Sequence, residues 1–453
     1  MKICVIGAGT YGSYIINSLQ NKHPEAEITL FEVGSNQIKS EEEIGYLSKS
    51  MKAIYRGLAH GRFFGFGGTS TQWAGQLLTF SKNDFKEPSG FLNEIVDLNI
   101  KLKESVLKKF NIKNNYEEIK YPNGISLKTG VWLSFFSRNF YKHFKISKRK
   151  NLKIISDARV SHFQINSDNS VSKVFYYQGD IIQESVFDYY FLACGAFEAS
   201  RVLMQSNVIK SNKVFFSDHI AKKIFKISKG SKIDGLDFAF QIINTSLITR
   251  RFVGEIDGVS YYAHPVFNND FPFFQSLKEL MFKRNFSVKA VLNLFKDIPQ
   301  AMVFIYYVII KKRIYVKDGE WFLFIDIENP TKTSYVELSD QKDEYGLLGL
   351  NVHYEVDERA INIYNHAYKQ VKQILINSNT VFEDCFDEIQ VDTCEDIYHP
   401  YGMFSDYDSV KKYFNEYPNM LVVNTGILPR AGGINPTGAV LPLIDEFIEN
   451  YKF

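Results

Sequence analysis

The first apolar positions of the chain form a short run that leads directly into glycines. Residues Lys2–Ile6 have the pattern of a buried strand, Ser13–Asn21 that of a helix with one apolar face, and Glu27–Phe31 that of a second strand. A strand, a glycine turn, a helix and another strand are the repeating parts of a parallel sheet covered by helices. The N-terminal pattern therefore predicts an α/β domain.

Three later segments show related patterns. Residues 152–177 alternate apolar and polar positions, which predicts strands of a small sheet. Residues 189–206 (YYFLACGAFEASRVLMQS) predict a strand, a turn of small residues and a helix. Near the C-terminus, Met420–Val423 predicts a strand, and a helix is expected after Pro442. Segments far apart along the chain thus contribute to one α/β domain.

The composition narrows the class of protein. The chain has 453 residues, 45% of them apolar, which excludes a disordered tail, a collagen and a small disulfide scaffold. Its 53 basic and 51 acidic side chains argue against a nucleic-acid binder. The 4 cysteines form no CxxC pair, which argues against a zinc site. The first apolar run is too short for a signal peptide, and Ala301–Ile310 is too short to span a membrane. A cytoplasmic enzyme is the expectation.

The glycines after the first strand have the spacing of a dinucleotide-binding turn. In this GxGxxG pattern Gly7 permits a tight turn, Gly9 lets the backbone approach a pyrophosphate, and Gly12 lets the helix pack against the strand. Glu32 ends the second strand at the distance where a ribose ligand is expected. The arrangement predicts dinucleotide binding, with a purely structural turn as the alternative, and it does not distinguish NAD from FAD.

A second cluster of glycines occupies residues 61–76 (GRFFGFGGTSTQWAGQ). So many glycines are unsuited to a helix or strand interior, and they suggest backbone pressed against a flat or charged group. The alternative is a long structural loop.

This second cluster resembles the flavin-contacting segment of the glucose–methanol–choline (GMC) oxidoreductases. The similarity is greatest to the sugar-oxidising branch, which includes pyranose oxidases. Other segments also resemble the family: residues 189–206, the Asp218-His219 pair, residues 325–340, His399-Pro400-Tyr401-Gly402 and residues 432–437 (GGINPT). Some relatives carry a flavin-linking histidine where this chain has Gln72, so the resemblance implies a non-covalent FAD.

The resemblance also implies a fold and a set of cofactor contacts. It implies a Rossmann-like FAD-binding domain of residues 1–90, 150–225 and 395–453. Residues 91–149 and 226–394 would form an α+β substrate domain on an antiparallel sheet. The implied FAD contacts are Gly7, Gly9, Gly12, Glu32, Gly68, Thr69, Ser70, Trp73, Gly75, Val160, Ala193, Gly195, Asn424, Thr425, Pro436 and Thr437.

The resemblance implies that His399 and Asn435 carry the chemistry. Oxidation of an alcohol removes a hydroxyl proton as a hydride leaves the same carbon, and a positioned base lowers the barrier. Histidine suits the role of base, and Asn435 would hydrogen-bond the substrate oxygen. A core histidine and a plain Asn-Pro turn are the alternatives. The implied substrate is a sugar, a polyol or a sugar-containing conjugate. The electron acceptor stays open among oxygen, a quinone, another protein and a second substrate, and a reversible internal oxidation that returns the hydride to the same sugar is a further alternative.

Two departures from the family pattern affect the expected site. Asn424 replaces an aspartate that is usual near the ribityl chain, and Met403-Phe404 replaces a run that usually begins with threonine. Arg430 stands where a small polar residue is common, and it would either attract an anionic substrate or pair with a carboxylate. An NAD-dependent oxidoreductase and a non-catalytic flavin-binding protein therefore remain alternatives.

Residues 271–313 combine many apolar side chains with an excess of basic ones and end in Lys311-Lys312-Arg313. A basic amphipathic surface of this kind can bind anionic lipid. Peripheral contact with the inner membrane surface is one interpretation, and core helices with solvated ends are the other.

Overall fold

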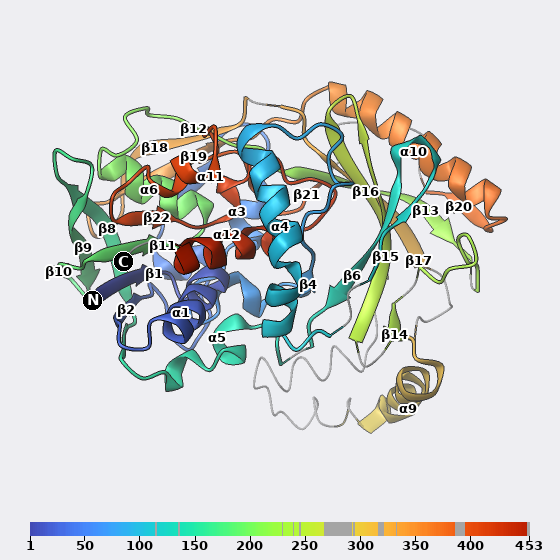
Figure 1. Cartoon of the computed structure of the whole chain (residues 1–453), viewed down its shortest axis with the longest axis horizontal. Helices are drawn as coiled ribbons and strands as arrows, with labels where there is room; N and C mark the ends of the chain where they lie inside the picture. The colour runs from blue at the N-terminus through green and yellow to red at the C-terminus, as the bar shows by residue number, and fades with distance from the viewer. Residues whose placement is uncertain are drawn as a thin grey trace.

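The computed structural model describes residues 1–450 except 114–115, 135, 229, 239, 244–245, 267–291, 293–294, 316–320, 332 and 386–394. Within these ranges the chain forms four sheets, and one core of buried apolar side chains continues through the molecule. Figure 1 shows the parallel sheet with its helices at the left of the molecule and the large antiparallel sheet at the right.

The parallel sheet has five strands in the order β22-β11-β1-β2-β7. Its bounds are β1 Lys2–Ile6, β2 Glu27–Phe31, β7 Leu152–Ile155, β11 Tyr189–Leu192 and β22 Met420–Val422. Helix α1 (Thr10–Lys22) follows β1, and α6 (Ala196–Gln205) follows β11. The strand–turn–helix patterns of the sequence are thus present, and all neighbouring strands in this sheet run parallel.

The sequence pattern of residues 152–177 is divided between two sheets. Strand β7 joins the edge of the parallel sheet beside β2. Only β8 (Ala158–Ile165) and β9 (Val171–Gln178) belong to the small antiparallel sheet, which β10 (Ile181–Ser185) completes. The prediction of one small sheet was wrong for β7, because strand alternation does not reveal which partner supplies the hydrogen bonds.

The large antiparallel sheet follows the order β20-β13-β17-β16-β15-β6-β4, with β14, β21 and β5 paired to it. Its strands are β4 Gln76–Leu77, β5 Ile119–Lys120, β6 Ser126–Trp132, β13 His219–Ile227, β14 Gln241–Ile243, β15 Ser246–Ile256, β16 Val259–Val266, β17 Trp321–Glu328, β20 Phe382–Asp384 and β21 Glu395–Asp396. A further sheet pairs β12 (Val214–Phe215), β18 (Tyr335–Lys342), β19 (Leu348–His353) and β3 (Ser48–Ser50). The domain boundaries themselves stay a prediction.

Helices cover the sheets on different sides (Figure 1). Helix α10 (Arg359–Asn377) packs on β15, β16 and β17 of the large sheet. Helix α12 (Thr437–Asn450) packs between α1 and α4 (Gly90–Lys109). The short helices are α2 Glu41–Ile44, α3 Arg56–His60, α5 Phe140–His143, α9 Ile298–Tyr306 and α11 Val410–Phe414.

The C-terminal helix begins earlier than the sequence indicates. It starts at Thr437, so Pro442 lies inside it and not before it. Proline gives up one hydrogen bond to the carbonyl four residues earlier, that of Gly438. Most of the helix is nevertheless buried, Pro442 included, and burial of this face outweighs the lost hydrogen bond.

No helix among the described residues is long and apolar enough to cross a membrane. Of the basic apolar segment 271–313, residues 271–291 and 293–294 lie outside the described residues. Helix α9 and the single π-helical turn Tyr307–Lys311 belong to the described part.

Candidate functional site

Two glycine-rich loops meet at the carboxyl end of β1. Gly67 N–H donates to the Ala8 carbonyl at 3.0 Å. A Cβ on Gly68 would come within 2.9 Å of the Gly9 Cα, and a Cβ on Gly12 would overlap the Gly7 carbonyl. Glycine is required at these contacts because two backbones occupy the space of a side chain. The loops of the two sequence clusters therefore form one wall.

The Glu32 carboxylate holds this wall together through hydrogen bonds to the backbone. One carboxylate oxygen accepts from Ala8 N–H at 2.7 Å, and the other accepts from Gly34 N–H at 3.0 Å and Gly65 N–H at 2.9 Å. Burial raises the pKa of Glu32, while these backbone donors act against that rise. The residue thus joins the ends of β1 and β2 to the second glycine loop.

A cavity of about 700 Å³ extends from the glycine loops to the face of the large sheet. Most of the residues expected at the site line it. They are Gly7, Gly9, Glu32, Gly68, Thr69, Trp73, Gly75, Val160, Ala193, Gly195, Asn424, Thr425, Thr437, His399 and Asn435, together with Gln72. One cavity therefore collects residues from both glycine clusters, from the turn after β11 and from the two C-terminal motifs.

Three expected cofactor contacts lie outside the lining. Gly12 packs against Gly7 behind the loop. The Ser70 hydroxyl donates to the Gly67 carbonyl at 2.6 Å and accepts from Phe140 N–H at 3.2 Å. Pro436 is buried at the start of α12. These residues shape the wall of the cavity from behind.

Asn424 provides a test of whether the cavity suits a flavin. Its side-chain oxygen accepts from Gly426 N–H at 2.8 Å, whereas its side-chain nitrogen is buried without a partner among the described residues. A buried amide donor is costly unless a hydrogen-bond acceptor satisfies it. Asn424 lines the cavity, so a polar ring system bound there would meet an available donor. The donor set and the glycine walls fit FAD.

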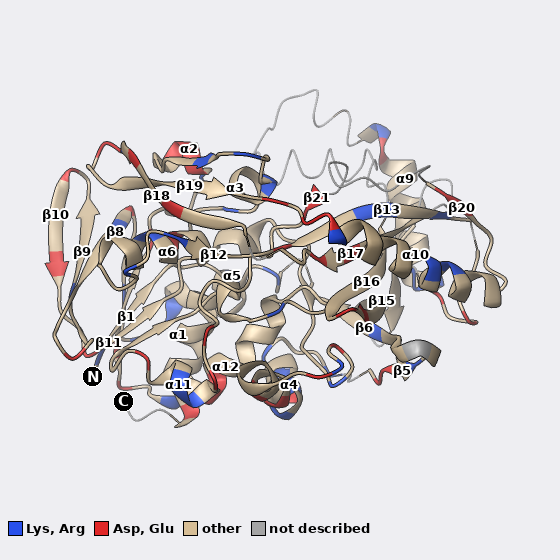
Figure 2. Cartoon of the chain, turned by 90° about the horizontal axis from the view of Figure 1, so that it is seen from above, with Lys and Arg blue, Asp and Glu red and all other residues tan. Residues whose placement is uncertain are grey.

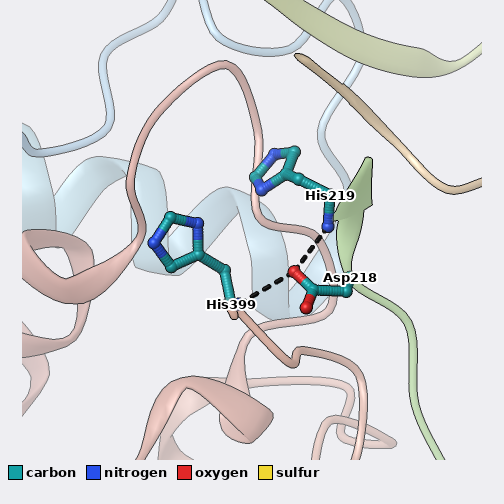
Figure 3. Close-up of side chains that lie close together, drawn as sticks. All are labelled: Asp218, His219 and His399. Atoms are coloured by element: carbon teal, nitrogen blue, oxygen red, sulfur yellow. Dashed lines mark hydrogen bonds between the residues drawn. The ribbon is translucent and has the colours of Figure 1, made fainter. Parts of the chain in front are cut away.

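His399 lies beside His219 at the other end of the cavity, and Asp218 joins their backbones (Figure 3). One oxygen of Asp218 accepts from His219 N–H at 2.7 Å and from His399 N–H at 2.8 Å. Its second oxygen accepts from the Tyr55 hydroxyl at 2.6 Å. The carboxyl group thus connects β13 to the loop that carries His399.

The histidine rings stand at right angles, with centroids 5.9 Å apart. Nε2 of His219 faces the Gly432 carbonyl at 2.7 Å. A carbonyl can only accept, so this nitrogen carries a proton. Nδ1 of His399 is buried and finds no partner in the described part of the chain.

Burial determines the protonation of this group. It lowers the pKa of His399 to about 3, and the neighbouring His219 acts in the same direction. Burial likewise raises the pKa of Asp218 to about 8 in spite of its three donors. The His399 ring is therefore neutral near pH 7. Although Asp218, His219 and His399 have a ligand-like spacing, both oxygens of Asp218 already accept hydrogen bonds, which disfavours a metal ion.

The large sheet contributes a polar face that the sequence analysis did not identify. Tyr262, His264 and Asp326 line the cavity from β16 and β17. His264 Nε2 lies 3.2 Å from one oxygen of Asp326, and the Tyr262 hydroxyl also bonds this carboxylate. The other oxygen of Asp326 is buried and unpartnered within the described ranges. Burial acts to raise the pKa of Asp326. The contacts with His264 and Tyr262 act in the opposite direction and outweigh burial, so the pKa of Asp326 lies below its ordinary value.

Strand alternation explains why these side chains face the cavity. The hydroxyl of Tyr261 bonds Gln370 of α10 at 2.6 Å on one face of the sheet. Tyr262 points to the opposite face, as does its cross-strand neighbour Asp326. Polar residues two positions apart on apolar strands were the available signal, but the sequence does not say which face is covered by a helix.

Arg430 is engaged in an ion pair. Its guanidinium donates to Glu328 at 2.6 and 3.1 Å, and Glu255 lies 3.5 Å away. Glu328 also accepts from Gly432 N–H at 2.9 Å. Of the two roles considered for Arg430, the structure supports pairing with a carboxylate, and Arg430 is not among the residues that line the cavity. This cluster instead holds the loop leading to Asn435.

Two solved structures have an architecture similar to that of this chain. Pyridoxine 4-oxidase from Mesorbium loti superposes with a TM-score of 0.59 at 14% identity, covering 99% of each chain. A formate oxidase variant from Aspergillus oryzae RIB40, used to examine FAD modification, gives a TM-score of 0.52 at 11% identity. That match covers 99% of this chain and 97% of the other. The fold is that of the GMC oxidoreductases.

The expected fold class is thereby confirmed, with a Rossmann-like parallel sheet and a second region built on an antiparallel sheet. No protein-family model matches the sequence. A sequence search of curated proteins also finds no match. The likeness to known proteins lies in the fold.

Proposed function

We propose that this protein is an FAD-dependent oxidoreductase that oxidises an alcohol group of a sugar, a polyol or a sugar-containing conjugate. The observation that carries the proposal is the shared cavity. It brings His399 and Asn435 together with the two glycine loops and the unpartnered amide of Asn424. The GMC fold supports the same chemistry. FAD would be held without a covalent bond, since Gln72 stands at the position of the flavin-linking histidine of some relatives.

Bound FAD would supply the acceptor for the hydride. The chain supplies the proton acceptor and the orientation of the substrate. His399 is neutral near pH 7 because its pKa is lowered to about 3, so its ring can take the hydroxyl proton. Any negative charge that develops beside the ring raises this pKa and strengthens the base. Asn435 would donate to the substrate oxygen and hold its carbon in line for hydride loss.

The polar face of the large sheet supports a polyhydroxylated substrate. Asp326 lines the cavity, and Tyr262 and His264 fix the position of its carboxylate. A carboxylate accepts hydrogen bonds from hydroxyl groups and rejects a carboxylate-bearing substrate by repulsion. Gln76 and Trp132 also line this end, and a flat indole suits the apolar face of a sugar ring. A neutral, hydroxyl-rich substrate fits this chemistry.

The first test is the visible absorption spectrum of the purified protein before and after heating. We expect a two-band flavin spectrum and release of intact FAD into the supernatant. Anaerobic addition of sugars and polyols should then bleach the bound flavin. A colourless protein that also fails to take up added FAD would contradict the proposal.

The second test concerns the base. Replacing His399 by Ala should lower the rate of flavin reduction about 10²–10⁴-fold, the range for a lost general base, while FAD stays bound. His366→Ala is the matched control, because His366 is exposed on α10 outside the cavity lining. Equal reduction rates in the two variants would remove His399 from the mechanism.

A further inference from the structure

Helix α9 and the turn that follows it expose an apolar surface. Between Ile298 and Ile310 the sequence has no charged residue. Met302 is 61% exposed and Ile310 62%, and Ala301 is the one buried residue of α9. The other large exposed side chains of this surface are Ile298, Val303, Ile305, Tyr306 and Ile309. A contiguous patch of this kind usually marks an interaction site.

Basic side chains stand at both ends of this apolar surface. Lys296 precedes it, next to the half-buried Asp297, and Lys311 and Lys312 follow it; the three lysines are exposed. Arg313 is held by Asp237 at 2.7 Å, so it fixes the segment to the protein. An apolar stretch with lysines at its ends matches the boundary of an anionic bilayer, where apolar side chains enter the acyl region and lysines meet phosphates.

The surface is fixed to the body of the protein near the part of the cavity that Trp132 lines. Ile242 N–H of β14 donates to the Lys312 carbonyl at 2.7 Å, and Ile314 N–H donates to the Phe240 carbonyl at 3.1 Å. The Phe240 ring packs on Trp132 with centroids 4.8 Å apart, and Trp132 lines the cavity. A single layer of side chains therefore lies between this attachment and the cavity. Both views place α9 at the periphery of the molecule (Figures 1 and 2).

We propose that α9 and the turn to Lys312 dock this protein on an anionic lipid bilayer, with the helix lying in the plane of the interface. The segment is too short to span a bilayer but long enough to insert one apolar face. Docking brings the Trp132 end of the cavity toward the membrane. A substrate with a hydroxylated head group and a lipid tail then fits the site, and this last step rests on the proposed function.

Vesicle co-sedimentation tests the docking without reference to flavin or turnover. The probes are phosphatidylcholine vesicles with and without phosphatidylglycerol, at low and at high salt. The full chain should sediment with the anionic vesicles at low salt and much less at high salt, because salt screens the lysines. Failure to sediment with anionic vesicles at low salt overturns the proposal, whatever the flavin assays give.

Variants separate the apolar and charged contributions. The double change Met302→Glu with Ile309→Glu should reduce binding by at least about 100-fold, since each side chain alone is worth about tenfold. Lys311→Gln with Lys312→Gln should reduce binding to anionic vesicles by about fivefold per lysine, corresponding to about 1 kcal/mol each. Ile181→Glu is the matched control, because Ile181 is 67% exposed on β10. Unchanged binding in the first variant overturns the proposal.

A second copy of the chain could instead cover the apolar surface. In that case sedimentation velocity would show a dimer that the Met302→Glu, Ile309→Glu variant dissociates, without lipid binding by either protein, and the proposal fails. If the glutamate pair does not fold, Met302→Gln with Ile309→Gln gives the same comparison without added charge.

Discussion

The two ends of the cavity differ in what lines them: backbone at one end and side chains at the other. At the parallel sheet the wall is backbone, with Gly9 and Gly68 in contact and Glu32 holding three N–H groups. At the large sheet the wall is side chains, with Asp326, His264 and Tyr262 in one bonded group. A backbone wall tolerates few residue types and suits one invariant ligand. A side-chain wall can change residue by residue, so the difference supports our proposal that the cofactor binds at the first end and the substrate at the second.

The loop carrying Asn435 belongs to both ends. Glu328 of the large sheet accepts from Arg430 and from Gly432 N–H, and His219 Nε2 donates to the Gly432 carbonyl. The position of Asn435 therefore depends on buried charges of the substrate end, although its chain continues into α12 of the cofactor end. Variants at each end should have separable effects.

The largest effect is expected at the backbone wall. Gly12→Val would drive a side chain into the Gly7 carbonyl, and we expect a loss of about 3 kcal/mol in unfolding free energy together with loss of FAD. Gly179→Ala is the control for backbone strain alone, because nothing lies within 4 Å of its added Cβ and only its φ of +58° opposes the change, so it should cost less and leave FAD bound. Flavin content and urea unfolding report the two effects. A Gly12→Val protein that retains its FAD would refute the backbone-wall interpretation.

Removing the Arg430–Glu328 ion pair, which holds the Asn435 loop, should reduce the free energy of unfolding by a similar amount. Arg430→Met leaves Glu328, whose side chain is 4% exposed, without its cationic partner. Removing one member of a buried pair costs about 3 kcal/mol or more. Adding Glu328→Gln should restore much of this stability in urea unfolding. A loss of below about 1 kcal/mol would instead be typical of an exposed pair.

At the side-chain wall, Asp326→Asn should raise KM about tenfold or more for any sugar or polyol that reduces the flavin. The change removes a charge-assisted hydrogen bond worth about 1.5–3 kcal/mol and leaves the glycine loops intact. Asp340→Asn, at an exposed position of β18, is the control. Loss of bound FAD in the Asp326 variant would show that the two ends are not separable.

The smallest effect, counted per pH unit, concerns the pH dependence of stability. The pKa of Asp218 is raised to about 8, so the folded chain holds a proton that the unfolded chain has lost. Stability from this group is complete below about pH 4 and falls as pH rises toward 8, by about 1.4 kcal/mol per pH unit. Asp218→Asn should flatten that fall in thermal unfolding at several pH values. An unchanged slope would mean that Asp218 is ionised in the folded chain.

Sequence reasoning was strongest where one short segment contains the whole geometry. The turn at Gly7 and Gly12 depends on residues that are neighbours along the chain, so its spacing predicted the strand, the helix and the parallel fold. It was weakest for Pro442, where burial of the whole helix outweighs a local helix-breaking signal, and for β7, whose partner lies far away in the sequence.

The α/β fold class and the residues of the glycine loops follow from the amino-acid sequence alone, since local spacing carries their backbone requirements. Three contacts follow only from the folded chain: Arg430 pairs with Glu328, Asp218 joins the His219 and His399 backbones, and Asp326 faces the cavity. Those contacts join strands and loops separated by many residues. Their existence depends on strand register and on which sheet face the helices cover, and neither is written in the local pattern.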